Sequence, residues 1–121
     1  MLNDAVGFEK IFIAVGRTDL RRGIDGLAGI VRSQFNLDPF QKNVLFLFCG
    51  SRTDRIKGLL WEGDGFLLLY KRLECNGTFK WPRHPEEAAE ITQEQLQNLM
   101  KGFEVIPRKT IQEIKPPTYI A

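Results

Sequence analysis

The sequence predicts one α+β domain in which two helices pack against a mainly antiparallel sheet of four to five strands. Three observations lead to this fold class: short apolar runs typical of strands, glycine-containing turns between them, and two segments whose apolar residues recur at helical spacing. Their order is strand, helix, a meander of strands and a final helix. We assign residues 1–106 to this domain and residues 107–121, which contain Pro116-Pro117, to an extended or partly disordered tail.

The first strand and the first helix are predicted within residues 11–35. Residues 11–15 form a β-rich apolar run, which Gly16 closes. Thr18 is placed to cap a helix, with Asp19 in the first turn where a negative charge is favoured. The predicted apolar stripe of this helix consists of Leu20, Ile24, Leu27, Val31 and Phe35.

Three glycines recur at every third position of this helix: Gly23, Gly26 and Gly29. Each costs a helix about 1 kcal/mol relative to alanine. We therefore expect a compensating interaction, most simply a close approach of the helix backbone to the sheet or to a partner protein.

The middle of the chain predicts the meander. Residues 44–48 are all apolar, which indicates a central strand covered on both faces. Residues 56–61 and 66–73 flank a glycine-containing turn and form a predicted hairpin. Asn76-Gly77 indicates a second hairpin, whose last strand would be residues 78–81.

Residues 83–87 are interpreted as a solvated linker before the final helix. Thr92 and Gln95 fit a capping box at the start of that helix, and Gly102 is a plausible stop. Its predicted buried stripe consists of Leu96, Leu99, Met100 and Phe103.

Composition limits the function classes. With 121 residues, 43% of them hydrophobic, the chain can bury a core without disulfides. It lacks a signal-peptide pattern and an apolar stretch of about 20 residues, so we expect a cytoplasmic protein that does not span a membrane. Cys49 and Cys75 are expected to be free thiols, and with His84 they are too few for a zinc site. We expect no metal and no cofactor.

Residues 16–27 read G-R-T-D-L-R-R-G-I-D-G-L and resemble the signature G-x-T-D-[ML]-R-[KR]-G-I-D-G-L. This signature belongs to the TnpB-type accessory proteins of the insertion-sequence-66 family of bacterial transposable elements. The similarity covers roughly residues 10–103, and its further motifs follow in the family's order at residues 38–40, 52–57, 61–66, 70–74 and 79–82.

The resemblance implies an accessory, non-enzymatic role in DNA transposition. Members of this family are encoded beside a separate, larger transposase. The transposase of the same element is therefore the expected partner, and the expected role is to help assemble its complex.

The basic residues suggest contact with double-stranded DNA. The net charge is only +2, but residues 17–80 carry eleven Lys and Arg against seven Asp and Glu. If the basic residues after the central strand share a face with those ending a neighbouring strand, they form a patch suited to phosphates. The DNA-binding hypothesis comprises Arg21, Arg22, Arg52, Arg55, Lys57, Lys71 and Arg72. The alternative is that these charges are solvated, with Arg21 paired to Asp25.

A second hypothesis is a protein-interaction adaptor that does not contact nucleic acid. Gly23, Gly26 and Trp81 are its candidate interface, because Trp81 ends a predicted strand beside a proline and is expected to be exposed. The other strand aromatics are expected to fill the core rather than to stack on bases. They are Trp61, Tyr70 and Phe79.

A metal-dependent nuclease is the least favoured hypothesis. Two-metal catalysis needs converging acidic ligands, and the carboxylates of this chain show no such spacing. Structural roles explain these carboxylates better. The carboxylates considered are Asp19, Asp25, Asp54, Glu62, Asp64 and Glu74.

Overall fold

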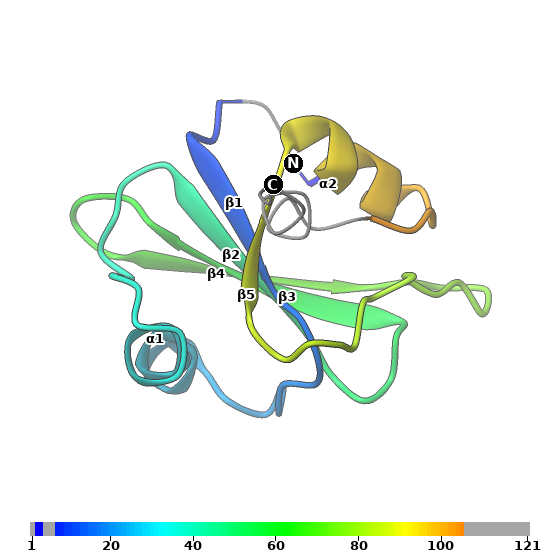
Figure 1. Ribbon diagram of the computed structural model, residues 1–121, viewed down its shortest axis with the longest axis horizontal. Helices are drawn as coiled ribbons and strands as arrows, with labels where there is room; N and C mark the ends of the chain where they lie inside the picture. The colour runs from blue at the N-terminus through cyan, green and yellow to red at the C-terminus, as the bar shows by residue number, and fades with distance from the viewer. Residues whose placement is uncertain (1, 4–6, 106–121) are drawn as a thin grey trace, which may run out of the picture.

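The computed structural model describes residues 2–3 and 7–105 of the chain. Their fold is a five-stranded sheet with helices packed against it (Figure 1). This confirms the predicted α+β class. The strands are β1 Lys10–Ala14, β2 Val44–Cys49, β3 Arg55–Trp61, β4 Phe66–Arg72 and β5 Ala88–Ile91, and the helices are α1 Ile24–Ser33 and α2 Gln93–Met100.

The strand order is β4-β3-β2-β1-β5. Of the four strand pairs in the described part of the chain, only β1–β2 is parallel, so the sheet is mainly antiparallel as predicted. A parallel pair needs a long crossover, and the segment containing α1 supplies it. All six residues of β2 are buried, which confirms the predicted central strand.

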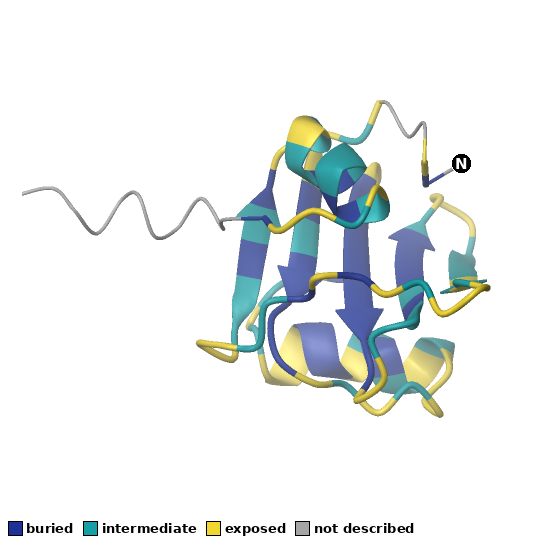
Figure 2. Ribbon diagram, turned by 90° about the vertical axis from the view of Figure 1, so that its right-hand side faces the viewer, coloured by how far each residue is buried: buried dark blue, intermediate teal, exposed yellow. Residues whose placement is uncertain are grey.

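The two helices cover opposite faces of the sheet (Figure 2). On the α1 face, Phe46 and Phe48 of β2 pack in one cluster with Leu27 and Val31 of the helix. On the α2 face, Leu45 and Leu47 of β2 pack with buried residues of α2 and of the segment before β5: Phe79, Trp81, Leu96 and Leu99.

The predicted start of the first helix was wrong. The helix begins at Ile24, with Gly23 as its N-cap, and Thr18 lies outside it. The Asp19 carboxylate accepts hydrogen bonds from the Arg21 backbone N–H at 3.0 Å and from its guanidinium at 2.9 Å. This local bonding offers the backbone a turn in place of a helix, and it replaces the expected pair between Arg21 and Asp25.

The expected approach of the glycine row to the sheet was also wrong. Apart from its chain neighbours and the helix's own backbone, a Cβ atom at Gly23 or Gly29 would meet no described heavy atom within 4 Å, and the atoms nearest to one at Gly26 belong to the Arg22 side chain. The two outer glycines are exposed. Packing against the sheet therefore does not explain why glycine occupies these positions.

The second hairpin was predicted only in part. A turn is present, with Cys75 and Asn76 at φ of 55° and 61°. Residues 78–81 nevertheless form no strand, although the Phe79 N–H donates to the Thr53 carbonyl at 2.7 Å. The Phe79 and Trp81 side chains enter the α2-face core. The fifth strand is β5, which pairs with β1 and which the sequence analysis did not predict.

The final helix was predicted well. The Gln95 N–H donates to the Thr92 hydroxyl at 3.0 Å, and the Thr92 N–H donates to the Gln95 side chain at 2.7 Å, as in a capping box. Gly102 has a φ of 91° just past the helix, as a stop requires. Phe103 is 59% exposed and so does not join the buried stripe. The predicted tail, residues 107–121, lies outside the described residues.

The open surroundings of Gly29 make it a test of the α1 face. We expect Gly29→Ala to raise the free energy of unfolding by up to about 1 kcal/mol, because alanine has the higher helix propensity. Urea denaturation measures the change. As a control, Gly16→Ala should destabilise the fold, because Gly16 has a φ of 101° and a Cβ there would lie 2.8 Å from Glu86 Cγ. Destabilisation by Gly29→Ala would show that the helix face is not open.

Candidate nucleic-acid interface

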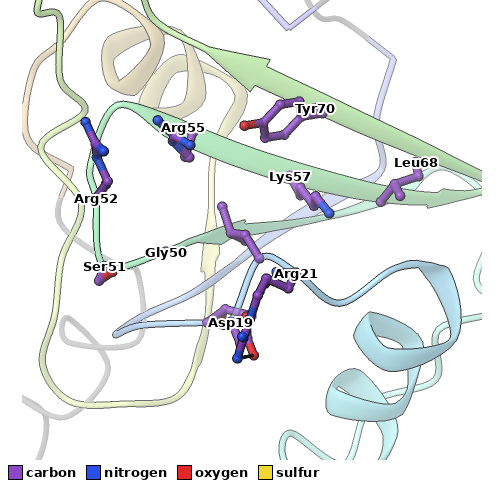
Figure 3. A pocket seen from close by; sticks show the side chains of 11 residues that line it. Asp19, Arg21, Gly50, Ser51, Arg52, Arg55, Lys57, Leu68 and Tyr70 are labelled. Atoms are coloured by element: carbon purple, nitrogen blue, oxygen red, sulfur yellow. Dashed lines mark hydrogen bonds and ion pairs between the residues drawn. The ribbon is translucent and has the colours of Figure 1, made fainter.

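A hollow of about 660 Å³ opens on the α1 face, beside the N-terminal end of α1 (Figure 3). We call it the basic groove. Turn residues before α1 form one side, the β2–β3 loop forms a second, and β3 and β4 form the third. Its lining residues are Thr18, Asp19, Leu20, Arg21, Gly50, Ser51, Arg52, Arg55, Lys57, Leu68 and Tyr70.

Strand alternation places the basic residues of β3 in the groove. Arg55 and Lys57 are two positions apart, so they point to the same face of the sheet. The antiparallel register sets Tyr70 of β4 directly opposite Lys57, whose Nζ lies 5.8 Å from the tyrosine ring centre. Lys57 also donates to the Arg22 carbonyl at 3.0 Å, which holds the pre-helix turn against the strand.

Two carboxylates hold groove arginines in place: Asp19 binds Arg21, and Asp54 binds Arg55. The hydrogen bond from Arg21 lowers the pKa of the Asp19 carboxyl to about 2. The hydrogen bond from Arg55 lowers the pKa of Asp54, and Asp54 raises the pKa of Arg55 in return. Both carboxylates are thus ionised at neutral pH. Four basic side chains against two carboxylates leave two positive charges in excess in and beside the groove.

The groove brings together four of the seven residues predicted to contact DNA: Arg21, Arg52, Arg55 and Lys57. Arg21 and Arg52 have side chains that are 91% and 74% exposed, so both can reach a ligand. Figure 3 shows Asp19 and Arg21 on one side and Arg55, Lys57 and Tyr70 on the other.

The other three predicted residues lie outside the groove. Lys71 points to the α2 face, where its Nζ donates to the Asn3 side chain. Arg72 lies opposite Arg55 in the ladder and pairs with Glu74 at 3.2 Å. The Arg22 side chain lines a smaller hollow of about 270 Å³. The predicted single patch is therefore divided. Strand alternation puts Lys71 on the other face of the sheet, whereas Arg72 shares the face of Arg55 but does not line the groove.

The expectation that Trp81 is exposed was wrong. Its side chain is only 5% exposed, and its indole N–H donates to the Ala14 carbonyl at 3.0 Å. The apolar body of the ring fills the α2-face core while the N–H finds a backbone partner. Trp81 thus offers no exposed surface to a partner, whereas Gly23 is exposed and Gly26 is half-buried.

Sequence reasoning missed Arg83, which holds the groove walls in place. Its guanidinium donates to the Gly16 carbonyl at 2.8 Å and to the Gly50 carbonyl at 2.9 Å. Gly16 lies just after β1. Gly50 lies just after β2, in the loop that lines the groove. No spacing pattern marks Arg83, and the segment was interpreted as a solvated linker.

The cysteines and carboxylates give no sign of catalysis in the described part of the chain. Cys49 is buried and Cys75 is exposed, and both are free as predicted. Burial raises the pKa of the Cys49 thiol to about 11. Among the described residues, no three His, Cys, Asp or Glu side chains gather closely enough to hold a metal ion. None of the described helices is long and apolar enough to cross a membrane.

One family model and two proteins of a single organism match the chain. The family model described as IS66 Orf2 like protein matches residues 9–110. Uncharacterized protein y4jC of Sinorhizobium fredii is 32% identical over 112 residues, which cover 93% of each chain. Uncharacterized protein y4hO of the same organism is 36% identical over 95 residues, which cover 78% of this chain and 81% of the relative. No solved structure matches the chain.

We expect Arg83→Met to lower the free energy of unfolding by about 2–3 kcal/mol, because it leaves two carbonyls without a charged donor. Urea denaturation measures this. Arg52→Met is the matched control and should change stability by less than about 0.5 kcal/mol, since that side chain is exposed. Equal stability of the two variants would contradict the role of Arg83.

Thiol labelling tests the two cysteine environments. At pH 8 we expect a fast reaction of Cys75 alone in the folded protein and of both thiols in urea, because burial keeps Cys49 protonated and inaccessible. In the Cys75→Ser variant, fast labelling of the folded protein should disappear.

Because the folded pKa of Cys49 is raised from 9.0 to about 11, its contribution to stability is complete below pH 9 and is lost as the pH rises towards 11.

Proposed function

Because the chain belongs to the family of IS66 Orf2 like proteins, we propose that it helps assemble a transposase complex by binding the element's DNA through the basic groove. The family itself has an accessory role in transposition. The observation that carries the proposal is the convergence of Arg21, Arg52, Arg55 and Lys57 from separate segments at one opening.

The geometry of the groove suits a phosphate backbone. Arginine presents a planar fork of donors that matches phosphate oxygens, and lysine adds a compact positive charge. The carboxylates beside Arg21 and Arg55 keep each guanidinium oriented, while the exposed Arg52, whose guanidinium lies 3.9 Å from Asp54, can turn towards the DNA. Contacts of this kind position a protein on a duplex without reading its sequence.

A contact with the transposase is the second part of the proposal. Gly23 and Gly29 are exposed and have open space where a side chain would point. Glycine is costly at Gly29, which lies inside the helix, and packing inside the described fold does not compensate for that cost. Gly23 is the N-cap of the helix, where glycine is well tolerated. A partner that approaches the α1 backbone closely would supply the compensation, so we place the transposase contact on this helix face.

The DNA proposal predicts a defined salt dependence. The double variant Arg52→Gln/Lys57→Gln should bind a duplex of element-end sequence about tenfold more weakly at 100 mM salt, and the slope of log K against log salt should shrink by about 2. Fluorescence anisotropy between 50 and 200 mM salt measures both quantities.

The matched control is Lys80→Gln/Lys101→Gln, which removes the same charge at exposed positions outside the groove. This variant should keep the salt slope of the unmodified protein. Equal losses in both variants would mean that only net charge matters. Absence of DNA binding at 50 mM salt, together with capture of purified transposase, would overturn the groove proposal and favour the adaptor hypothesis.

A further inference from the structure

Strand β4 is an edge of the sheet that the described part of the fold does not protect. Within the described residues it pairs only with β3 (Figure 1). It has seven residues, and its apolar run from Phe66 to Tyr70 is half-buried at most positions and exposed at Tyr70. Proteins protect such edges with short strands, prolines or charged side chains. The opposite edge, β5, has only four residues. Strand β4 is longer and has no proline, and its two charged residues, Lys71 and Arg72, both stand at one end.

The hydrogen-bond pattern shows which β4 residues present free backbone groups. The Glu62 N–H donates to the Gly65 carbonyl, and the Leu73 N–H donates to the Asp54 carbonyl. Bonded pairs alternate in an antiparallel ladder, so odd-numbered residues between these two bonds face β3. Phe66, Leu68, Tyr70 and Arg72 therefore direct their N–H and C=O groups outward.

The sequence of β4 is nearly symmetric about Leu68. Residues 66–70 read F-L-L-L-Y. An antiparallel pairing of two β4 strands centred on Leu68 sets Phe66 of one copy opposite Tyr70 of the other. Every outward-facing residue then meets another outward-facing residue, as a bonded ladder requires.

Charge supports the same register. Arg72 would lie beside the turn that precedes β4 of the second copy, near Asp64, and both side chains are exposed in one chain. Each strand has its basic residues at one end only, so antiparallel pairing keeps like charges apart. Opposite charges across a strand pair are stabilising, and like charges are not.

We propose that two copies of the chain pair through β4, antiparallel and centred on Leu68, to form one continuous sheet. The two-fold axis of such a pair is perpendicular to the sheet, so both α1 helices and both basic grooves lie on the same face. Phe66 of the second copy then stands beside Tyr70 at the rim of each groove. The pairing does not depend on whether the groove binds DNA.

Disulfide trapping in a Cys75→Ser background tests the register. A bonded pair at the two-fold axis has Cα atoms about 5.5 Å apart, which is within disulfide reach. The full-length Leu68→Cys variant should therefore cross-link to a dimer under mild oxidation. The Arg72→Cys variant is the control, because its two copies would lie roughly 27 Å apart along the ladder and should not cross-link. Cross-linking of neither variant, or of both equally, would overturn the proposal.

A charge exchange tests the same interface without a substitution in the apolar run. By sedimentation equilibrium, Arg72→Asp and Asp64→Arg should each raise the dimer dissociation constant roughly tenfold, because each brings like charges close together at both ends of the pairing. The double variant should restore the dissociation constant to within about threefold. A monomeric unmodified chain, or a double variant no better than either single one, would contradict the pairing.

Discussion

The complete burial of β2 is the constraint on which the rest of the structure depends. A strand with apolar side chains on both sides must be covered on both sides. One cover is α1, which lies in the crossover between the parallel strands β1 and β2. The other is α2 together with Phe79 and Trp81, which return from the far end of the chain. Because β1 and β2 are parallel, the loops that follow them emerge at the same end of the sheet, where Arg83 bridges them.

The basic groove follows from the limited extent of the α1 cover. The helix begins only at Ile24, because Asp19 directs the preceding residues into a turn. Arg21 thereby faces the strands instead of continuing a helix, and the part of β3 and β4 beyond the helix stays open. Arg55, Lys57 and Tyr70 lie on that uncovered surface. The same carboxylates that shape the loops also pair with the groove arginines. Asp19 pairs with Arg21, and Asp54 pairs with both Arg55 and Arg52.

Tyr70 links the two surfaces that we propose to be functional. Its ring lies beside Lys57 in the groove, and its backbone belongs to the open edge of β4. Pairing of two β4 edges would extend the sheet and set two grooves on one face. An accessory protein of this size gains contact area in that way, because a single groove offers only a few phosphate contacts.

The sequence by itself determined the family, the α+β class, the central strand, the β3–β4 hairpin and the capped final helix. Each of these depends on contacts between residues close in the chain or on a continuous apolar run. Only the tertiary structure decided which basic residues share a face, that Trp81 is buried, that Arg83 bridges two loops and that β5 pairs with β1. These features join residues far apart in sequence, such as Arg83 and Gly16, and local periodicity carries no information about such pairs. The start of α1 was missed for the opposite reason, because one local hydrogen bond at Asp19 outweighed a helical pattern of apolar residues.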